Sequence, residues 1–186
     1  EFDFNLGLDM KLALSSSLNL DLTFNPDFSQ VEVDEQRTNL TRFELFLPEK
    51  REFFNDNADL FSNLGSREAR PMFTRRIGIV KDTVTSQYVQ NPIIYGAKLS
   101  GKINEDLRIG ILNMQTANLS SSGVPSYNYG MAVLERNILR NSKISSFIIN
   151  KQPLFNNKEN AYATDLNDFN RVFGIESKLQ TNNTQF

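Results

Sequence analysis

A strict alternation of apolar and polar residues at the start of the chain constrains its fold more than any other feature. Every even position from residue 2 to residue 14 holds a large apolar side chain, whereas the odd positions between them hold Asp, Asn, Gly, Lys or Ala. A period of two places successive side chains on opposite faces of a strand. Serines follow at 15–17, and the alternation resumes from Leu18 to Phe24. These residues predict a β-hairpin with one apolar and one polar face.

The same unit recurs further along the chain. Residues 93–102 and 107–111 alternate around a polar turn at 104–106, and residues 127–133 are expected to pair with 144–149 across 140–142. A last strand contains Phe173 and Ile175. Short turns therefore alternate with long connections, which run from about 25 to 91, 116 to 126 and 150 to 168. Outer-membrane barrels show this pattern, with short periplasmic turns and long external loops.

Alternation alone is compatible with two locations for the apolar face. It faces inward in a soluble sandwich or lipocalin-like barrel, and it faces lipid in a transmembrane barrel. The first strand exceeds the roughly 9–11 residues that a tilted spanning strand needs. Its apolar row is uninterrupted, and small residues occupy the opposite face of several strands, which favours the membrane; residues 144–149, which alternate poorly, argue against it. We therefore predict an all-β, antiparallel up-and-down transmembrane β-barrel segment, about eight strands of a larger barrel. The soluble β-domain is the alternative.

Composition excludes several other classes. No stretch approaches the roughly 18 apolar residues of a spanning helix, and 15 Phe and 5 Tyr argue against a disordered chain. The chain has no Cys and no His, which removes thiolate chemistry and the commonest metal ligand and general base. A net charge of −2 shows no basic excess for nucleic acid. We predict no metal, no cofactor and no catalytic residue, and we lean against an enzyme. Because residue 1 is Glu and no signal peptide is present, we expect a piece of a longer protein.

The connection from 25 to 91 is too long for a plain loop, so we expect it to be a lumenal or external insertion within a single β-barrel segment spanning 1–186. A turn signal at 25–27 stops the preceding strand. Residues 40–47 are expected to form a short helix, because Leu40, Phe43 and Leu47 share a helical face and Pro48 ends it. The insertion therefore makes the barrel partly helical.

Charged and aromatic residues of this insertion are the candidate ligand site. Carboxylates with aromatic rings can bind sugars, and a carboxylate pair can hydrolyse a glycoside at separations of roughly 5–5.5 Å or 6.5–9.5 Å. A structural salt-bridge network that anchors the insertion to the barrel wall is the simpler interpretation. Arg75 and Arg76 are expected at the start of a strand, with one of them pointing inward to pair with an acid or clamp an anion. The candidate residues are Glu32, Asp34, Arg42, Glu44, Glu49, Arg51, Phe53, Phe54, Arg75 and Arg76.

Several short motifs carry a family resemblance. Residues 7–54, from GLDMKLAL to PEKREFF, together with RRIG at 75–78, resemble a family of Bacteroidetes-type proteins known as domain of unknown function 5916. Where the family usually reads Phe-Pro-Glu-Lys-Arg-Pro-Phe-Phe, this chain has Leu47 and Glu52 at the first and sixth positions, and Thr74 replaces a usual Ser. The family's characteristic positions correspond here to Asn25, Pro26, Asp27, Phe28, Glu32, Asp34, Asn39, Phe43, Glu44, Pro48, Glu49, Lys50, Arg51, Phe53, Phe54, Arg75, Arg76 and Gly78.

The resemblance implies a bacterial outer-membrane β-barrel that commonly follows a secreted carbohydrate-binding module of family nine. It implies no catalytic residue. The function expected is to bind or pass carbohydrate or related ligands at the cell surface. The alternatives are a glycoside hydrolase-associated enzyme and a structural subunit of an outer-membrane assembly. The expected partners are outer-membrane lipid, a carbohydrate ligand, and the remaining strands of a longer chain or partner envelope proteins.

Overall fold

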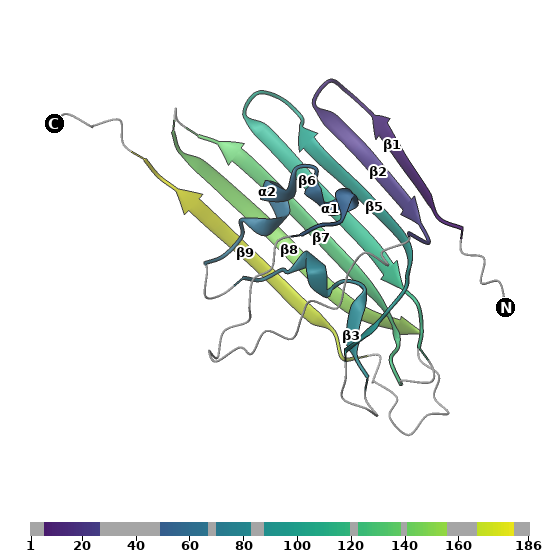
Figure 1. Cartoon of the computed structure of the whole chain (residues 1–186). Helices are drawn as coiled ribbons and strands as arrows, with labels where there is room; N and C mark the ends of the chain where they lie inside the picture. Colours follow the sequence, from purple (N-terminus) through teal and green to yellow (C-terminus); the bar gives the residue numbers. More distant parts are fainter. Residues whose placement is uncertain are drawn as a thin grey trace.

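Seven strands form one antiparallel sheet in the computed structural model, which describes residues 6–26, 49–66, 70–82, 88–119, 123–138, 141–155 and 167–180 (Figure 1). The strand order is β1-β2-β5-β6-β7-β8-β9, and every pairing is antiparallel. The strands are β1 (Leu8–Ala13), β2 (Leu18–Phe24), β5 (Ile93–Lys102), β6 (Leu107–Thr116), β7 (Ser126–Asn137), β8 (Lys143–Phe155) and β9 (Asn170–Lys178). The all-β, antiparallel prediction is confirmed.

The connection between β2 and β5 supplies the remaining elements. They are α1 (Glu52–Asn55), α2 (Ala58–Ser62), the 3-10 helix η1 (Thr74–Arg76), and a two-stranded sheet of β3 (Ile79–Lys81) and β4 (Tyr88–Gln90). The helices α1 and α2 lie over one face of the large sheet (Figure 1). No helix in the described ranges is both long and apolar enough to cross a membrane.

Strand register confirms the three predicted hairpins. Leu12 pairs with Leu20, Leu99 with Ile111, and Met131 with Ile149. The turns of the three hairpins all lie at one end of the sheet, because β1, β5 and β7 run in the same direction. The long connections lie at the opposite end (Figure 1). β2 ends at Phe24, as the turn signal predicted, and Asn25 takes a left-handed conformation with φ of 43°.

The uncovered face carries a continuous apolar row that crosses all seven strands. Residues in direct register point to the same face, so the row can be followed from strand to strand. It consists of Leu12, Leu20, Leu99, Ile111, Ala132, Ile148 and Phe173. The exposed fraction is 41% for Ile111, 54% for Ile148 and 86% for Phe173. The predicted apolar face of the sheet is therefore the face that no described element covers.

The covered face differs between its two halves. The corresponding row begins with Lys11, Asp21 and Lys98 on β1, β2 and β5, and continues with Leu112, Met131, Ile149 and Val172 on β6 to β9. On the apolar half, Phe54, Leu60, Phe61, Leu64 and Ile77 of the long connection pack against the sheet in one buried cluster.

This cluster explains the poor alternation of residues 144–149. Ile144 and Ile148 lie on the uncovered face, whereas Phe147 and Ile149 pack into the cluster on the covered face. One face of β8 is apolar because it belongs to the uncovered row, and the other is apolar because it packs into the buried cluster. The sequence of β8 therefore does not alternate with a period of two.

Candidate functional site

Arg51 connects α1 to the turn that contains η1. Its side chain is buried, and its guanidinium donates to the carbonyl oxygens of Thr74 and Ile77, both at 2.7 Å. It also donates through Nε and Nη2 to the two carboxylate oxygens of Glu49, at 2.8 and 2.9 Å. The guanidinium carbon lies 4.2 Å from the centre of the Phe54 ring. A planar fork with several donors suits this arrangement, because one side chain satisfies a carboxylate and two carbonyl groups.

Glu49 is held as a carboxylate within this arrangement. Besides Arg51, the hydroxyl of Thr74 donates to its Oε2 at 2.7 Å. Burial raises the pKa of the Glu49 carboxyl, but the hydrogen bonds and positive charge of Arg51, together with the Thr74 hydroxyl, outweigh burial and hold the pKa below its ordinary value. A carboxyl that stays ionised and fully hydrogen-bonded is poorly suited to act as a general acid.

Lys98 fastens α1 to β5. Its side chain is 1% exposed, and Nζ donates to the backbone oxygens of Phe53 and Asp56. Nζ also lies 3.1 Å from Asp21 Oδ2, a charge contact without hydrogen-bond geometry. Lys98 is not among the residues that the sequence predicted for the site. The sequence did contain one indication: Lys98 lies between Gly96 and Ser100 on the same face of β5, and these small neighbours leave room for the lysine side chain to lie against the sheet.

Further ion pairs join the helical segment to the large sheet. Asp59 accepts two hydrogen bonds from Arg108, at 2.7 and 3.0 Å, and Arg108 also pairs with Glu135 at 3.1 Å. On the same face of the sheet, at its β1 edge, Lys11 pairs with Asp56. The hydrogen bond from Arg108 holds the pKa of Asp59 below its ordinary value, and the hydrogen bond from Lys11 does the same for Asp56. The short helical segment is thus attached to both β1 and β6.

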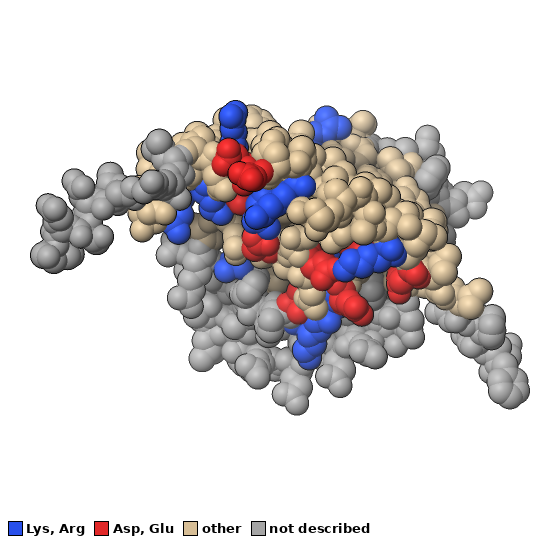
Figure 2. All heavy atoms as spheres, turned by 90° about the horizontal axis from the view of Figure 1, so that it is seen from above, with Lys and Arg blue, Asp and Glu red and all other residues tan. Residues whose placement is uncertain are grey.

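Seen from the tight-turn end, acidic and basic side chains lie next to one another (Figure 2). Some of these charges are paired, since Glu135 accepts hydrogen bonds from both Arg108 and Lys143. Among the described residues, this view shows charges of both signs and not a patch of one sign.

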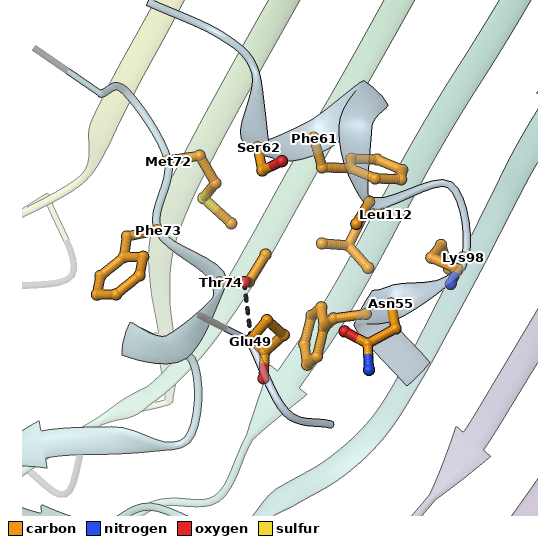
Figure 3. Close-up of a pocket in the computed structure, with 11 residues that line it drawn as sticks. Glu49, Asn55, Phe61, Ser62, Met72, Phe73, Thr74, Lys98 and Leu112 are labelled. Atoms are coloured by element: carbon orange, nitrogen blue, oxygen red, sulfur yellow. Dashed lines mark hydrogen bonds between the residues drawn. The ribbon is translucent and has the colours of Figure 1, made fainter. Parts of the chain in front are cut away.

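A cavity of about 220 Å³ lies between α1, α2 and the η1 turn, over β6 (Figure 3). Its lining is mostly apolar and comprises Phe54, Ala58, Phe61, Met72, Phe73 and Leu112. The polar lining residues are Glu49, Asn55, Ser62, Thr74 and Lys98. Glu49 and Thr74, which are bonded to each other, form one edge of the opening (Figure 3).

The structure brings together part of the predicted ligand site. Glu49, Arg51 and Phe54 meet in the arrangement described above, and the rings of Phe53 and Phe54 pack edge to face with centres 5.2 Å apart. The salt bridge between Arg51 and Glu49 joins parts of the long connection to each other, and a ligand-binding role for these residues stays a prediction.

The prediction that Arg75 and Arg76 begin a strand was wrong. They lie in the 3-10 helix η1, and β3 begins only at Ile79. One arginine is indeed buried and its neighbour exposed, but this results from the helical turn and not from strand alternation. The 3-10 helix η1 places the carbonyl groups of Thr74 and Ile77 where Arg51 can bind them.

Four of the predicted ligand residues lie outside the described residues. They are Glu32, Asp34, Arg42 and Glu44. The helix expected over 40–47 lies outside them as well. Within the described ranges, no group of three or more acidic side chains is arranged to hold a metal ion.

Comparison with known proteins identifies one family. The model of the family described as "Domain of unknown function (DUF5916)" matches residues 1–184, which is nearly the entire sequence. No curated protein and no solved structure gives a significant match.

Proposed function

Because the chain belongs to the DUF5916 family, whose description assigns no function, we infer its function from the geometry of the sheet. We infer that the sheet is part of the wall of a bacterial outer-membrane β-barrel. In this arrangement the uncovered apolar face contacts lipid, and the covered face lines the lumen. The segment that contains α1 and α2 lies inside as a plug.

The apolar row on the uncovered face is the observation that carries this proposal. A large exposed apolar patch on a protein marks a surface that contacts a partner or a membrane. Here the row extends across seven strands, while buried charged residues such as Lys98 and Arg51 lie on the covered side. Strands β5 and β6 have 10 residues each, and β7 and β8 have 12 and 13. These four lengths reach the roughly 9–11 residues of a tilted membrane-spanning strand. β1, which the sequence predicted to exceed that length, has only 6 residues, and β2 has 7.

The two edges of the sheet support a larger barrel. Seven antiparallel strands make β1 and β9 run in the same direction. A direct seam between β1 and β9 would therefore be parallel, whereas transmembrane barrels of this type close with antiparallel pairs and an even number of strands. We infer that an odd number of further strands completes the wall, since an open sheet edge is not tolerated in lipid.

The ligand expected from the family resemblance, a carbohydrate, stays a prediction. The hydrogen bonding of Glu49 by Arg51 and Thr74 favours a structural role for this carboxylate over the alternative of a glycoside hydrolase. We propose that α1 and α2 restrict the lumen, so that a solute would pass beside them.

A pair of isoleucine substitutions in the protein that contains this chain tests the location of the apolar row. Ile111→Lys places a charge at the middle of the row, and Ile103→Lys places the same charge in a tight turn, where the isoleucine is also exposed. In a membrane, lysine near the midplane costs about 2–4 kcal/mol and lysine near the interface about 0–1 kcal/mol. We expect Ile111→Lys alone to lower the urea midpoint of the protein folded into lipid vesicles and to reduce its recovery in outer membranes.

The soluble alternative predicts a different result. If the apolar face instead packs inside a soluble protein, Ile111→Lys still destabilises it, but the unmodified protein is recovered without detergent and does not insert into lipid vesicles. That result would require the membrane proposal to be abandoned.

A further inference from the structure

The cavity beside α1 and α2 has the size and lining of a site for one ring. Phe54, Phe61 and Leu112 are each at most 4% exposed, and they form its wall and floor together with Ala58 and Met72. An apolar cavity of roughly 150 Å³ accepts benzene, whereas pockets for drug-sized ligands begin at about 300 Å³. A volume of about 220 Å³ therefore fits a single aromatic ring with small substituents.

The two charged residues of the lining are compensated by groups around the cavity. Glu49 accepts hydrogen bonds from Arg51 and Thr74, and Lys98 donates to two backbone oxygens and lies beside Asp21. Neither charge needs a counter-ion from a ligand. An ionic ligand would lose its hydration without gaining an unpaired partner of opposite charge, so the lining favours a neutral molecule.

Two polar side chains of the lining retain hydrogen-bonding capacity. Ser62 is half-buried and Asn55 is exposed, and neither side chain hydrogen-bonds to another residue in the part of the chain that the structure describes. Both come from the helices that border the opening (Figure 3). They can bind one polar substituent of a ring that is otherwise surrounded by apolar side chains.

We propose that this cavity binds a neutral, single-ring aromatic molecule of the phenol type, with its ring against Phe54, Phe61 and Leu112 and its hydroxyl group at Ser62, the less exposed of the two polar residues. A sugar fits less well, because most of its hydroxyl groups would face apolar side chains and lose their hydrogen bonds to water. This inference goes beyond the proposed function, since the cavity lies between the helical segment and the sheet whether or not the sheet lies in lipid.

The experiment measures binding of 4-fluorophenol by ¹⁹F NMR to the protein that contains this chain, held in nanodiscs, with empty nanodiscs as the blank. We expect a saturable change in the signal of the ligand. Ala58→Leu fills the cavity from the first residue of α2 and should weaken binding by at least about tenfold. Ala132→Leu is the matched control, because it adds the same side chain on the uncovered face of β7 and should leave binding unchanged.

Ser62→Ala provides a second, milder test that does not change the packing of the helices. We expect it to reduce the preference for 4-fluorophenol over fluorobenzene by about fivefold, as the loss of one hydrogen bond does. If Ala58→Leu fails to fold, this comparison of two ligands still tests the proposal.

Three outcomes would overturn the inference. The first is the absence of saturable binding to the unmodified protein. The second is binding that Ala58→Leu leaves unchanged. The third is tighter binding of glucose or 4-fluorobenzoate than of 4-fluorophenol, provided that Ala58→Leu abolishes this binding and so places it in the cavity. None of these outcomes bears on the location of the apolar row, which the isoleucine substitutions test separately.

Discussion

The two halves of the covered face hold the helical segment by different means. Over β1, β2 and β5 the attachment is polar and depends on a few directional contacts, above all those of Lys98. Over β6 to β8 it is mainly apolar, and many side chains share it, although Arg108 of β6 also binds Asp59. Directional contacts between buried groups concentrate the free energy of attachment in single residues, whereas packing distributes it. The comparison shows that one short segment can be fastened by a single buried charge at one end and by a small hydrophobic core at the other.

Lys98→Met gives the largest expected effect on the polar half. The substitution removes the buried cation beside Asp21, leaving only the exposed Lys11 opposite it, and removes the donor to two backbone oxygens, so we expect a loss of about 3–5 kcal/mol in the free energy of unfolding. Urea unfolding measures it. Lys102→Met is the control, because this lysine lies on the same face of the same strand but is exposed.

A second substitution separates loss of the charge pair from loss of packing. Asp21→Asn in the background of Lys98→Met removes the charge of Asp21 and should recover part of the stability. If Lys98→Met costs no more than Lys102→Met, the polar half does not depend on this lysine and the contrast between the halves fails.

Gly110→Val tests the apolar half. A Cβ atom at Gly110 would lie 2.9 Å from Cζ of Phe61, so the buried Phe61 ring, or α2 with it, would have to shift. We expect overpacking to cost about 1–3 kcal/mol in the free energy of unfolding. Gly130→Val is the matched control, since a Cβ atom there would meet only the side-chain nitrogen of Asn113, at 3.8 Å.

The rescue of Gly110→Val identifies the contact responsible. Phe61→Leu shortens the side chain that a valine would meet and should restore part of the stability lost. Equal effects of valine at Gly110 and Gly130 would show that α2 does not pack closely on β6.

The strands were predictable from the sequence because their signal is local. The hairpins, the apolar face and the position of the tight turns all follow from alternation and turn residues, and the register confirms them. The signal failed at β8, where Phe147 and Ile149 pack under the helical segment. The burial of these residues depends on contacts with a segment that is distant in the sequence. The alternation of apolar and polar residues contains no information about such contacts.

The helices and the site were not predictable for a related physical reason. α1 and α2 have four and five residues and no side-chain N-cap hydrogen bond, so their own sequence stabilises them little. They form because Phe54, Leu60 and Phe61 pack on the sheet and because Lys98 binds the backbone oxygens of Phe53 in α1 and of Asp56 just after it. The role of Lys98 likewise depends on partners more than 40 residues away. Such long-range contacts leave no periodic pattern in the sequence.

The smallest expected effect is a pH dependence at the boundary between the two halves, where Asp59 of α2 binds Arg108. The hydrogen bond from Arg108 holds the pKa of Asp59 below its ordinary value of 3.8. The pair therefore stabilises the folded state fully above pH 3.8, and this contribution is lost as the pH falls through the lowered pKa of the folded state.

Asp59 is half-exposed, so we expect Asp59→Asn to cost only about 0.2–1 kcal/mol at pH 7. The difference between the two proteins in urea unfolding should disappear in strong acid and should also shrink in high salt, because exposed pairs are screened. Asp106→Asn, in an exposed tight turn, serves as the control. A difference that persists unchanged in strong acid would show that Asp59 acts through packing, which would place α2 entirely within the apolar half.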